Sequence, residues 1–392
     1  MKGGLKRVDK SSLKLASSET ARVINRNILL GLIRTHQPVS RAELARLSGL
    51  QRSTVSQIAE QLMKEHWICE GAAARLPRGR RPTMLSLNDN LAVLAADIHP
   101  TQAIVAIVDL NGRLLSRSTV PLSTDPARSV ASIVDCMRRI RDENRAKSVQ
   151  GIGVSVPGRV DSKSERLIFA PNLGWPAFDI KGTIEQRMGL PTVMENAANS
   201  CLAAEMWFGR MEGVRDAVLI TVSEGIGAGV LANGALMTGT NGMAGEFGHI
   251  SLDPSGPRCA CTQHGCWETF ASCNAALRYY KEFAQGKSRP TFHDLLLLAE
   301  AGDSNADRAL AKQASYIGRG LRMVTAALSP ELILVAGDVT SAWQRFASII
   351  EKELHHSALI RTAPRLQATH DGDVARLRGA AVLLLQRHFI HE

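Results

Sequence analysis

Long hydrophobic runs are absent from this sequence of 392 residues. No stretch of about 18 consecutive apolar residues occurs, which excludes a transmembrane helix. The first ten residues, M-K-G-G-L-K-R-V-D-K, are charged, but no apolar segment follows them, so they do not predict a secretory signal. We therefore expect a protein without a membrane-embedded part.

Cysteine is also scarce, with seven in the chain. Four of them are scattered, and nothing in their spacing suggests a disulfide framework: Cys69, Cys136, Cys201 and Cys273. This usage is typical of a reduced, cytoplasmic protein. The other three cysteines fall within eight residues of one another, and this clustering indicates a shared role.

Those three cysteines have the spacing Cys-x-Cys-x4-Cys, and a histidine precedes them by ten positions. Three thiols and one imidazole form a complete ligand set for tetrahedral Zn²⁺: His249, Cys259, Cys261 and Cys266. Since no position is left for water, we interpret the metal as structural. Two alternatives stay open, namely metal-free buried cysteines and His264 as the nitrogen ligand.

Positive charge is concentrated at the N-terminal end. Residues 1–90 contain 16 Lys and Arg against 7 Asp and Glu, whereas residues 91–392 contain 31 against 30. A basic head on a nearly neutral body is typical of a protein that binds a polyanion such as DNA. A solubilising basic tail is the alternative.

Residues 1–20 are rich in Lys and Ser and predict a flexible basic arm. Residues 21–66 predict three helices. The apolar face of the first is expected to contain Val23, Ile24, Ile28, Leu29, Leu32 and Ile33. The second helix begins at Ser40, where Glu43 three residues later predicts a capping box, and Ser48-Gly49 predicts the turn after it.

The third helix should bury Val55, Ile58, Ala59 and Leu62, which follow helical spacing. Its other face is polar near its start, as in the recognition helix of a helix-turn-helix. A strand from Trp67-Ile68, a return strand at residues 84–87 and an Arg-rich tip between them predict a wing. The predicted DNA contacts are Arg52, Ser53, Thr54, Ser56, Gln57, Arg78, Arg80 and Arg81.

From residue 91 the pattern changes to strand-strand-strand-helix units that occur twice. We expect strands near 91–98, 103–110, 151–156, 190–195, 217–222, 228–231 and 331–335. We expect helices near 130–140, 309–328 and 374–389, and another that follows the 190–195 strand and ends near residue 204. Gly318 and Gly320 are expected to be weak points of the 309–328 helix. This arrangement favours two α/β lobes with a ligand cleft between them.

Several motifs of this body occur in the order found in one family. They are G-I-G-V-S-V-P-G (151–158), P-N-L-G-W (171–175), E-N-A-A-N (195–199), E-G-I-G-A-G (224–229), A-G-E-F-G-H (244–249) and C-A-C-T-Q-H-G-C-W-E (259–268). On these motifs the chain resembles the ROK family of repressors, open reading frames and kinases, and specifically its transcriptional repressor branch. The resemblance implies an actin-like (ribonuclease H-like) two-lobe fold with a zinc-binding loop.

The resemblance also implies a carbohydrate site in the cleft. The matching positions are Asn196, Glu246, His249 and Glu268. In the family the counterpart of His249 is a zinc ligand close to the sugar, which would make the zinc loop a wall of the effector pocket. Carboxylates and amides at such a wall suit the paired donors and acceptors of sugar hydroxyls.

ROK kinases differ from this chain at four places. Their Asn-Asp-Ala-Asn, which supplies the catalytic base, is Asn196-Ala197-Ala198-Asn199 here. Their Asp-x-Gly-Gly-Thr phosphate loop is Asp97-Ile98-His99-Pro100-Thr101, in which His99 adds bulk and Pro100 has no N–H. Their Gly-Thr-Gly is Ser223-Glu224-Gly225, and their late Gly-Gly is Gly337-Asp338. Kinase activity is therefore not expected.

The sequence thus predicts an α/β protein with three parts: a flexible basic arm (1–20), a winged helix-turn-helix domain (21–90) and a two-lobe ROK sugar-sensing domain (91–392). Its predicted partners are a DNA operator and a small carbohydrate, and we expect a homodimer or homotetramer. The predicted function is that of a sugar-responsive transcriptional regulator, most simply a repressor. The alternatives are a sugar kinase with a DNA-binding head and an effector-independent DNA-binding protein.

Overall fold

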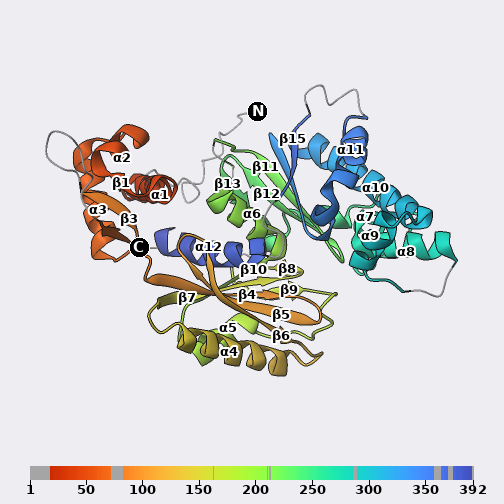
Figure 1. The fold of residues 1–392 in the computed structure, drawn as a ribbon, viewed down its shortest axis with the longest axis horizontal. Helices are drawn as coiled ribbons and strands as arrows, with labels where there is room; N and C mark the ends of the chain where they lie inside the picture. The colour runs from red at the N-terminus through yellow and green to blue at the C-terminus, as the bar shows by residue number, and fades with distance from the viewer. Residues whose placement is uncertain are drawn as a thin grey trace, which may run out of the picture. The chain divides into compact units, whose positions relative to one another are not determined.

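The computed structural model describes residues 18–71, 83–161, 163–209, 211, 213–285, 289–356, 363–369 and 374–390. The chain separates into two compact units (Figure 1). The first unit contains Met1–Leu91 and Leu385–Glu392, and the second contains Ala92–Leu384. Among the described residues, no helix combines the length and the apolar character that crossing a bilayer requires.

The described part of the first unit contains three complete helices, the last residues of α12 (Val374–Ile390) and a small antiparallel sheet. The helices are α1 (Ser18–His36), α2 (Arg41–Ser48) and α3 (Arg52–Lys64). The sheet has the order β1-β3-β2, with β1 at Val39–Ser40, β2 at Ile68–Glu70 and β3 at Met84–Leu87. The four residues predicted to form the buried face of α3, Val55, Ile58, Ala59 and Leu62, are all buried. Residues 18–20 belong to α1 and not to an arm, and residues 1–17 lie outside the described residues.

The predicted core face of α1 is partly wrong. Ile24 and Ile28 are 53% and 44% exposed, whereas Leu29, Leu30 and Ile33 are buried. The reason is a buried ion pair, because Arg26 on α1 points into the unit and binds Glu65 after α3 with both guanidinium NH2 groups. This ion pair fixes the rotation of α1, and Ile24 and Ile28 turn outward. The side chain of Val23 is outside the described part.

Only one of the two hydrogen bonds of the predicted capping box is present at the start of α2. The Ser40 hydroxyl accepts a hydrogen bond from the Glu43 amide at 3.2 Å, as an N-cap should. The Glu43 carboxylate does not return to the Ser40 amide but accepts from Arg46. Gly49 ends the helix in the left-handed region, with φ of 70°.

The second unit contains two five-stranded sheets with the same strand order. In the first sheet the order is β10-β7-β4-β5-β6. Its strands are β4 (Leu91–Ile98), β5 (Gln102–Asp109), β6 (Leu114–Pro121), β7 (Ser148–Val156) and β10 (Thr192–Asn196). The second sheet has the order β15-β14-β11-β12-β13. Its strands are β11 (Ala217–Val222), β12 (Ile226–Ala232), β13 (Ala235–Met237), β14 (Leu332–Ala336) and β15 (Arg365–Ala368).

In each sheet the three strands that come first in the chain pair antiparallel, namely β4, β5 and β6 in the first sheet and β11, β12 and β13 in the second. The other two strands of each sheet pair parallel, namely β7 with β10 and β14 with β15. The repeated strand-strand-strand-helix unit predicted from the sequence is therefore present twice. The first sheet packs with α4 (Pro126–Glu143) and α5 (Ile180–Met188), while the second packs with α8 (Cys273–Ala284) and α10 (Ser304–Leu328). Each sheet has its own hydrophobic core.

Two further helices, α6 (Ala197–Phe208) and α12 (Val374–Ile390), lie between the two sheets in Figure 1. Glycines permit their close approach. A Cβ atom at Gly379 on α12 would lie 1.7 Å from the Ser200 carbonyl oxygen on α6. A Cβ atom at Gly153 on β7 would lie 2.0 Å from the Ala380 carbonyl oxygen. The start of α12 is thus held tightly against both β7 and α6.

Short elements complete the second unit. They are β8 (Arg159–Val160), β9 (Leu167–Phe169), η2 (Thr240–Gly242), η3 (Glu246–His249), α7 (Glu268–Ala271), α9 (Phe292–Glu300), η4 (Asp338–Ala342) and α11 (Trp343–Leu354). The β8–β9 hairpin, η3 and α7 supply much of the site described below, and none of these elements follows from periodicity in the sequence.

Gly318 and Gly320 are not weak points of α10, which corrects the expectation from helix propensity. A Cβ atom at Gly320 would lie 1.9 Å from Cε2 of Trp267, and one at Gly318 would lie 2.7 Å from the Ile350 carbonyl oxygen. Trp267 is fully buried, and its indole N–H donates to the Tyr316 carbonyl at 2.8 Å. Gly320 therefore lets the indole of Trp267 pack directly on α10, and Gly318 lets α11 do the same.

We predict that Gly320→Ala destabilises the second unit by about 1–3 kcal/mol, because the added methyl group overpacks the indole of Trp267. Gly31→Ala is the control, since no atom lies within 4 Å of the added Cβ in α1. Helix propensity alone then makes this control more stable, by about 0.5–1 kcal/mol. Denaturant unfolding followed by circular dichroism checks both, and a stabilising Gly320→Ala would contradict the packing argument.

Candidate metal cluster and ligand cavity

The loop between η3 and α7 brings four metal-ligating side chains together. The ligand atoms of His249, Cys259, Cys261 and Cys266 all lie within 4.8 Å of one another. The Cys259 Sγ atom is 3.4 Å from His249 Nδ1, and the Cys261 and Cys266 sulfur atoms are 3.5 Å apart. Zn–S bonds of about 2.3 Å in a tetrahedron give ligand separations of about 3.8 Å. The four residues therefore fit a tetrahedral metal ion.

The backbone of this loop folds back on itself at Gly265. Its amide donates to the Pro257 carbonyl, and its carbonyl accepts from the Leu252 amide, both at 2.8 Å. Gly265 has φ of 67°, and a Cβ atom there would lie 1.6 Å from the Asp253 carbonyl oxygen. Only glycine fits this position, which explains how a short loop can place Cys266 beside His249.

His264, the alternative nitrogen ligand, is exposed and lies outside the cluster. Its Nδ1 atom is 3.2 Å from the Gly256 carbonyl oxygen. Of the two histidines, the structure brings His249 to the cysteines.

Two cysteines of the loop, Cys259 and Cys266, hold their protons more strongly than a free thiol does when no metal is bound. Burial raises the pKa of the Cys259 thiol far above its usual range, and the neighbouring Glu268 carboxylate adds to the rise. Burial also raises the pKa of Cys266 to about 11. A metal ion must displace these protons on binding, since thiolates are the ligands.

We predict that Cys261→Ser lowers the bound metal of the purified protein to a small fraction of the wild-type content, because one of four ligands is lost. His264→Ala should leave the metal content unchanged. Cys69→Ser, at an exposed cysteine of the first unit, controls for cysteine removal as such. Plasma emission spectrometry after gel filtration checks this, and metal loss in His264→Ala with retention in Cys261→Ser would reverse the ligand assignment.

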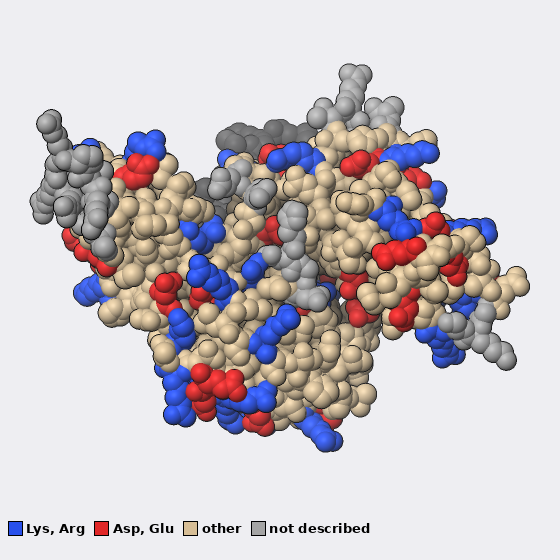
Figure 2. Space-filling model, in the orientation of Figure 1, with Lys and Arg blue, Asp and Glu red and all other residues tan. Residues whose placement is uncertain are grey.

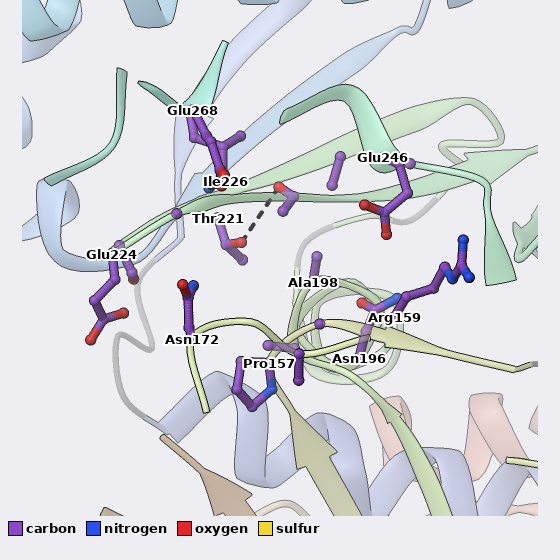
Figure 3. Close-up of a pocket in the computed structure, with 18 of the residues that line it drawn as sticks. Pro157, Arg159, Asn172, Asn196, Ala198, Thr221, Glu224, Ile226, Glu246 and Glu268 are labelled. Atoms are coloured by element: carbon purple, nitrogen blue, oxygen red, sulfur yellow. Dashed lines mark hydrogen bonds between the residues drawn. The ribbon is translucent and has the colours of Figure 1, made fainter. Parts of the chain in front are cut away.

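A cavity of the second unit lies against this loop (Figure 3). Its polar wall contains Arg159, Asn172, Asn196, Thr221, Ser223, Glu224, Glu246, His249, Glu268 and Arg376. Figure 3 shows Glu246 and Glu268 on one side of the cavity and Asn172, Asn196 and Pro157 on the other. The structure thus brings the four residues predicted to contact a sugar to one cavity.

The two glutamates are placed by the ends of short helices. Glu268 begins α7, and its carboxylate accepts from the Ile226 amide at 3.4 Å and from the Cys259 thiol at 3.0 Å. Glu246 begins η3, where burial raises the pKa of its carboxyl while the charges of His249 and Arg159 oppose the rise. Both carboxylates retain acceptor capacity toward the cavity.

Asn196 ends β10 and caps α6. Its Oδ1 atom accepts from the Asn199 amide at 2.8 Å, so part of its role is structural. Its Nδ2 group has no acceptor among the described residues. The amide can therefore hold the helix start with its oxygen and donate to a ligand with its nitrogen.

His249 belongs to both the cluster and the cavity. Its Nδ1 atom faces Cys259 Sγ, while its Nε2 atom is 3.7 Å from the Glu246 carboxylate. A metal-bound imidazole that faces a carboxylate with its other nitrogen is a common way of fixing ring orientation. The position of Glu246 is thereby connected to the metal cluster.

Arg376 is a wall residue that the sequence did not reveal. It comes from α12, and its guanidinium lies 3.8 Å from Asp97 Oδ2 and 3.4 Å from Ser223 Oγ. Asp97 in turn lies 2.7 Å from His99 Nε2. Burial lowers the pKa of His99, but the hydrogen bond and charge of Asp97 outweigh this and raise it. Arg376 has no sequence signal because it reaches this site only through the packing of α12.

The residues predicted to contact DNA lie in the first unit. On α3, Arg52, Ser53 and Gln57 are exposed, and Thr54 and Ser56 are half-buried. No side chain caps the start of α3, so its first amides remain available as donors. Arg78, Arg80 and Arg81 lie outside the described residues. On the face shown in Figure 2, basic and acidic side chains are interspersed over the second unit, as its nearly balanced sequence charge requires.

Comparison with known proteins agrees with this architecture of two sheets and a metal-ligating loop. The sequence pattern of the ROK family matches residues 93–387, and the chain belongs to the ROK family. The xylose repressor of Bacillus spizizenii is 30% identical over 346 residues, which are 87% of this chain and 89% of the repressor.

Two solved structures separate two types of relative. A ROK family transcriptional regulator, a homolog of the E. coli MLC protein, has a TM-score of 0.80 at 25% identity and covers 94% of this chain and 97% of its own. A ROK family glucokinase from Streptomyces griseus, in complex with glucose and AMPPNP, has a TM-score of 0.68 at 30% identity. The match spans 99% of the kinase but 75% of this chain. The regulator therefore matches a part of the chain that the kinase does not.

Proposed function

We propose that this protein is a sugar-responsive DNA-binding transcriptional regulator, and most simply a repressor, that binds a carbohydrate in the cavity beside the metal cluster. One observation carries the proposal: hydroxyl-binding groups surround the cavity, while the groups that a kinase would use on ATP are replaced. The similarity to a xylose repressor over 87% of this chain supports the same function.

The first unit is proposed to be a winged helix-turn-helix domain that covers residues 21–90. Gly49 makes the tight turn between α2 and α3, and α3 presents a polar face opposite its buried one. Such a helix can enter a major groove with the side chains near its start toward the base edges. The positive charge of residues 1–90 would supply affinity for the phosphate backbone.

The metal is proposed to be a structural zinc ion. Three thiolates and one imidazole in a tetrahedral arrangement favour Zn²⁺ over the harder cations. The four ligands would be His249, Cys259, Cys261 and Cys266. Thiolate formation would end the donation from the Cys259 thiol to Glu268, and this carboxylate would then be available to a ligand in the cavity.

The carbohydrate is proposed to contact Asn196, Glu246, His249 and Glu268. Two carboxylates that accept and an amide nitrogen that donates match the hydroxyls of a sugar ring. A ligand that lacks one of these hydroxyls would leave a buried polar group unpaired, and this penalty is the source of selectivity.

Phosphate transfer is not part of the proposal. Ala197 follows Asn196 at the start of α6, where no side chain can take a proton from a sugar hydroxyl. The Asp97 carboxylate is engaged by His99 and lies beside Arg376, and Glu224 adds negative charge where a phosphate would have to bind. Each feature disfavours a bound nucleotide or its reaction.

A dimer or a dimer of dimers is proposed as the functional form, because repressors with such domains bind two half-sites related by two-fold symmetry. The carbohydrate can change operator affinity only by binding the DNA-bound and the free arrangements unequally. A ratio of about 100 between the two affinities corresponds to about 2.7 kcal/mol of coupling.

The test combines a DNA site selected by the protein from a random pool with a panel of mono- and disaccharides. We predict that at least one saccharide changes DNA affinity, and that Glu246→Gln weakens that response by about 10- to 100-fold while DNA binding alone is unchanged. Glu282→Gln is the matched control, since Glu282 is half-exposed on α8, away from the cavity wall. Fluorescence anisotropy measures both.

A coupled assay with ATP and the same panel addresses the rival function. Saccharide-dependent ATP consumption that disappears in Asp97→Ala would show a kinase and overturn the proposal. If DNA is bound but no saccharide alters DNA affinity or thermal stability, the protein is an effector-independent DNA-binding protein.

A further inference from the structure

The cavity contains a guanidinium group that forms no ion pair with a described carboxylate. Arg159 begins β8 and lines the cavity beside Asn196 and Glu246 (Figure 3). No described carboxylate lies within 4.0 Å of its nitrogen atoms, and its only described polar contact is to the thioether sulfur of Met243. The Nε atom is buried and has no hydrogen-bond partner in the described part of the chain.

The other cavity charges already have partners. Arg376 lies beside Asp97, and Glu268 accepts from Ile226 and Cys259. Glu246 lies near His249, and Figure 3 shows Glu224 at the end of the cavity opposite to Arg159. The charge of Arg159 acts on Glu246 from beyond ion-pair distance, and the guanidinium donors of Arg159 are left for a ligand.

An unpaired and partly desolvated guanidinium is costly, and a native structure retains such a group most readily where a ligand satisfies it. The planar fork of arginine matches the two oxygens of a carboxylate. The glutamates of the same wall repel added negative charge, and they repel a doubly charged phosphate more than a singly charged carboxylate. The geometry thus distinguishes two types of anion.

We propose that the effector is an acidic saccharide of the uronic acid type. Its carboxylate pairs with Arg159, and its ring hydroxyls face Glu246, Glu268 and Asn196. This inference rests on the proposed function, because it names the class of ligand for the same cavity. It makes Arg159 the residue that discriminates between acidic and neutral sugars.

The test is isothermal titration calorimetry of the metal-loaded full-length protein with matched sugars: glucuronate against glucose, galacturonate against galactose, and glucose 6-phosphate. At least one uronate should bind about 10- to 100-fold more tightly than its neutral counterpart, as expected for a charge-assisted pair. Arg159→Gln should remove this preference while the neutral sugar binds as before. Arg159→Lys, which keeps the charge but not the fork, should restore only part of it.

Arg166→Gln is the matched control, because Arg166 lies between β8 and β9 and is 69% exposed. It should bind both sugars like the wild type, and the metal content and unfolding temperature of every variant establish that the loop and fold are intact. Equal binding of uronate and neutral sugar, a preference that survives Arg159→Gln, or binding of the phosphate alone would overturn this inference and leave the proposed function standing. If no saccharide binds, both fail.

Discussion

The cavity depends on one side chain that serves two sites. His249 directs Nδ1 to the cysteine cluster and Nε2 to Glu246, while Glu268 touches both Cys259 and the backbone of β12. A loop of this length has little hydrophobic surface of its own, so a bound metal is the strongest source of order available to it. A metal ion held by the four residues would therefore help the short helices to position the two carboxylates of the cavity wall.

The repeated sheet explains why a cavity exists at this place. Asn196 lies at the carboxyl end of β10, and Ser223 and Glu224 directly follow β11, so both sheets present strand ends to the same region. Strand ends leave backbone groups and side chains unpaired, which is why ligands of α/β proteins bind there. In this chain Arg376 and Asp97 occupy part of that region as an ion pair. The fold is similar to that of a ROK family glucokinase, but in this chain charged side chains occupy the region of the strand ends.

Local patterns in the sequence predicted much of this structure. The buried face of α3, most strands of both sheets and the cluster of three cysteines follow from spacing, because each depends on residues close together in the chain. The rotation of α1, the need for Gly320 beside Trp267 and the arrival of Arg376 could not be predicted, because each depends on a partner far away in the sequence. Arg159 was visible as a residue, but the missing hydrogen-bond partner of its Nε atom is a property of the folded cavity.

We propose that a metal ion bound by the four residues orders the effector site, and that the proposed DNA-binding unit does not depend on this ion. The most direct measurement compares effector affinity and DNA affinity in the same preparation before and after the metal is removed with a chelator and then restored. We expect metal removal to weaken effector binding at least tenfold, with little change in the affinity for DNA, and added Zn²⁺ to restore effector binding. Unchanged effector affinity in the metal-free protein would show that the loop is not the wall of the site, and that the metal ion does not order it.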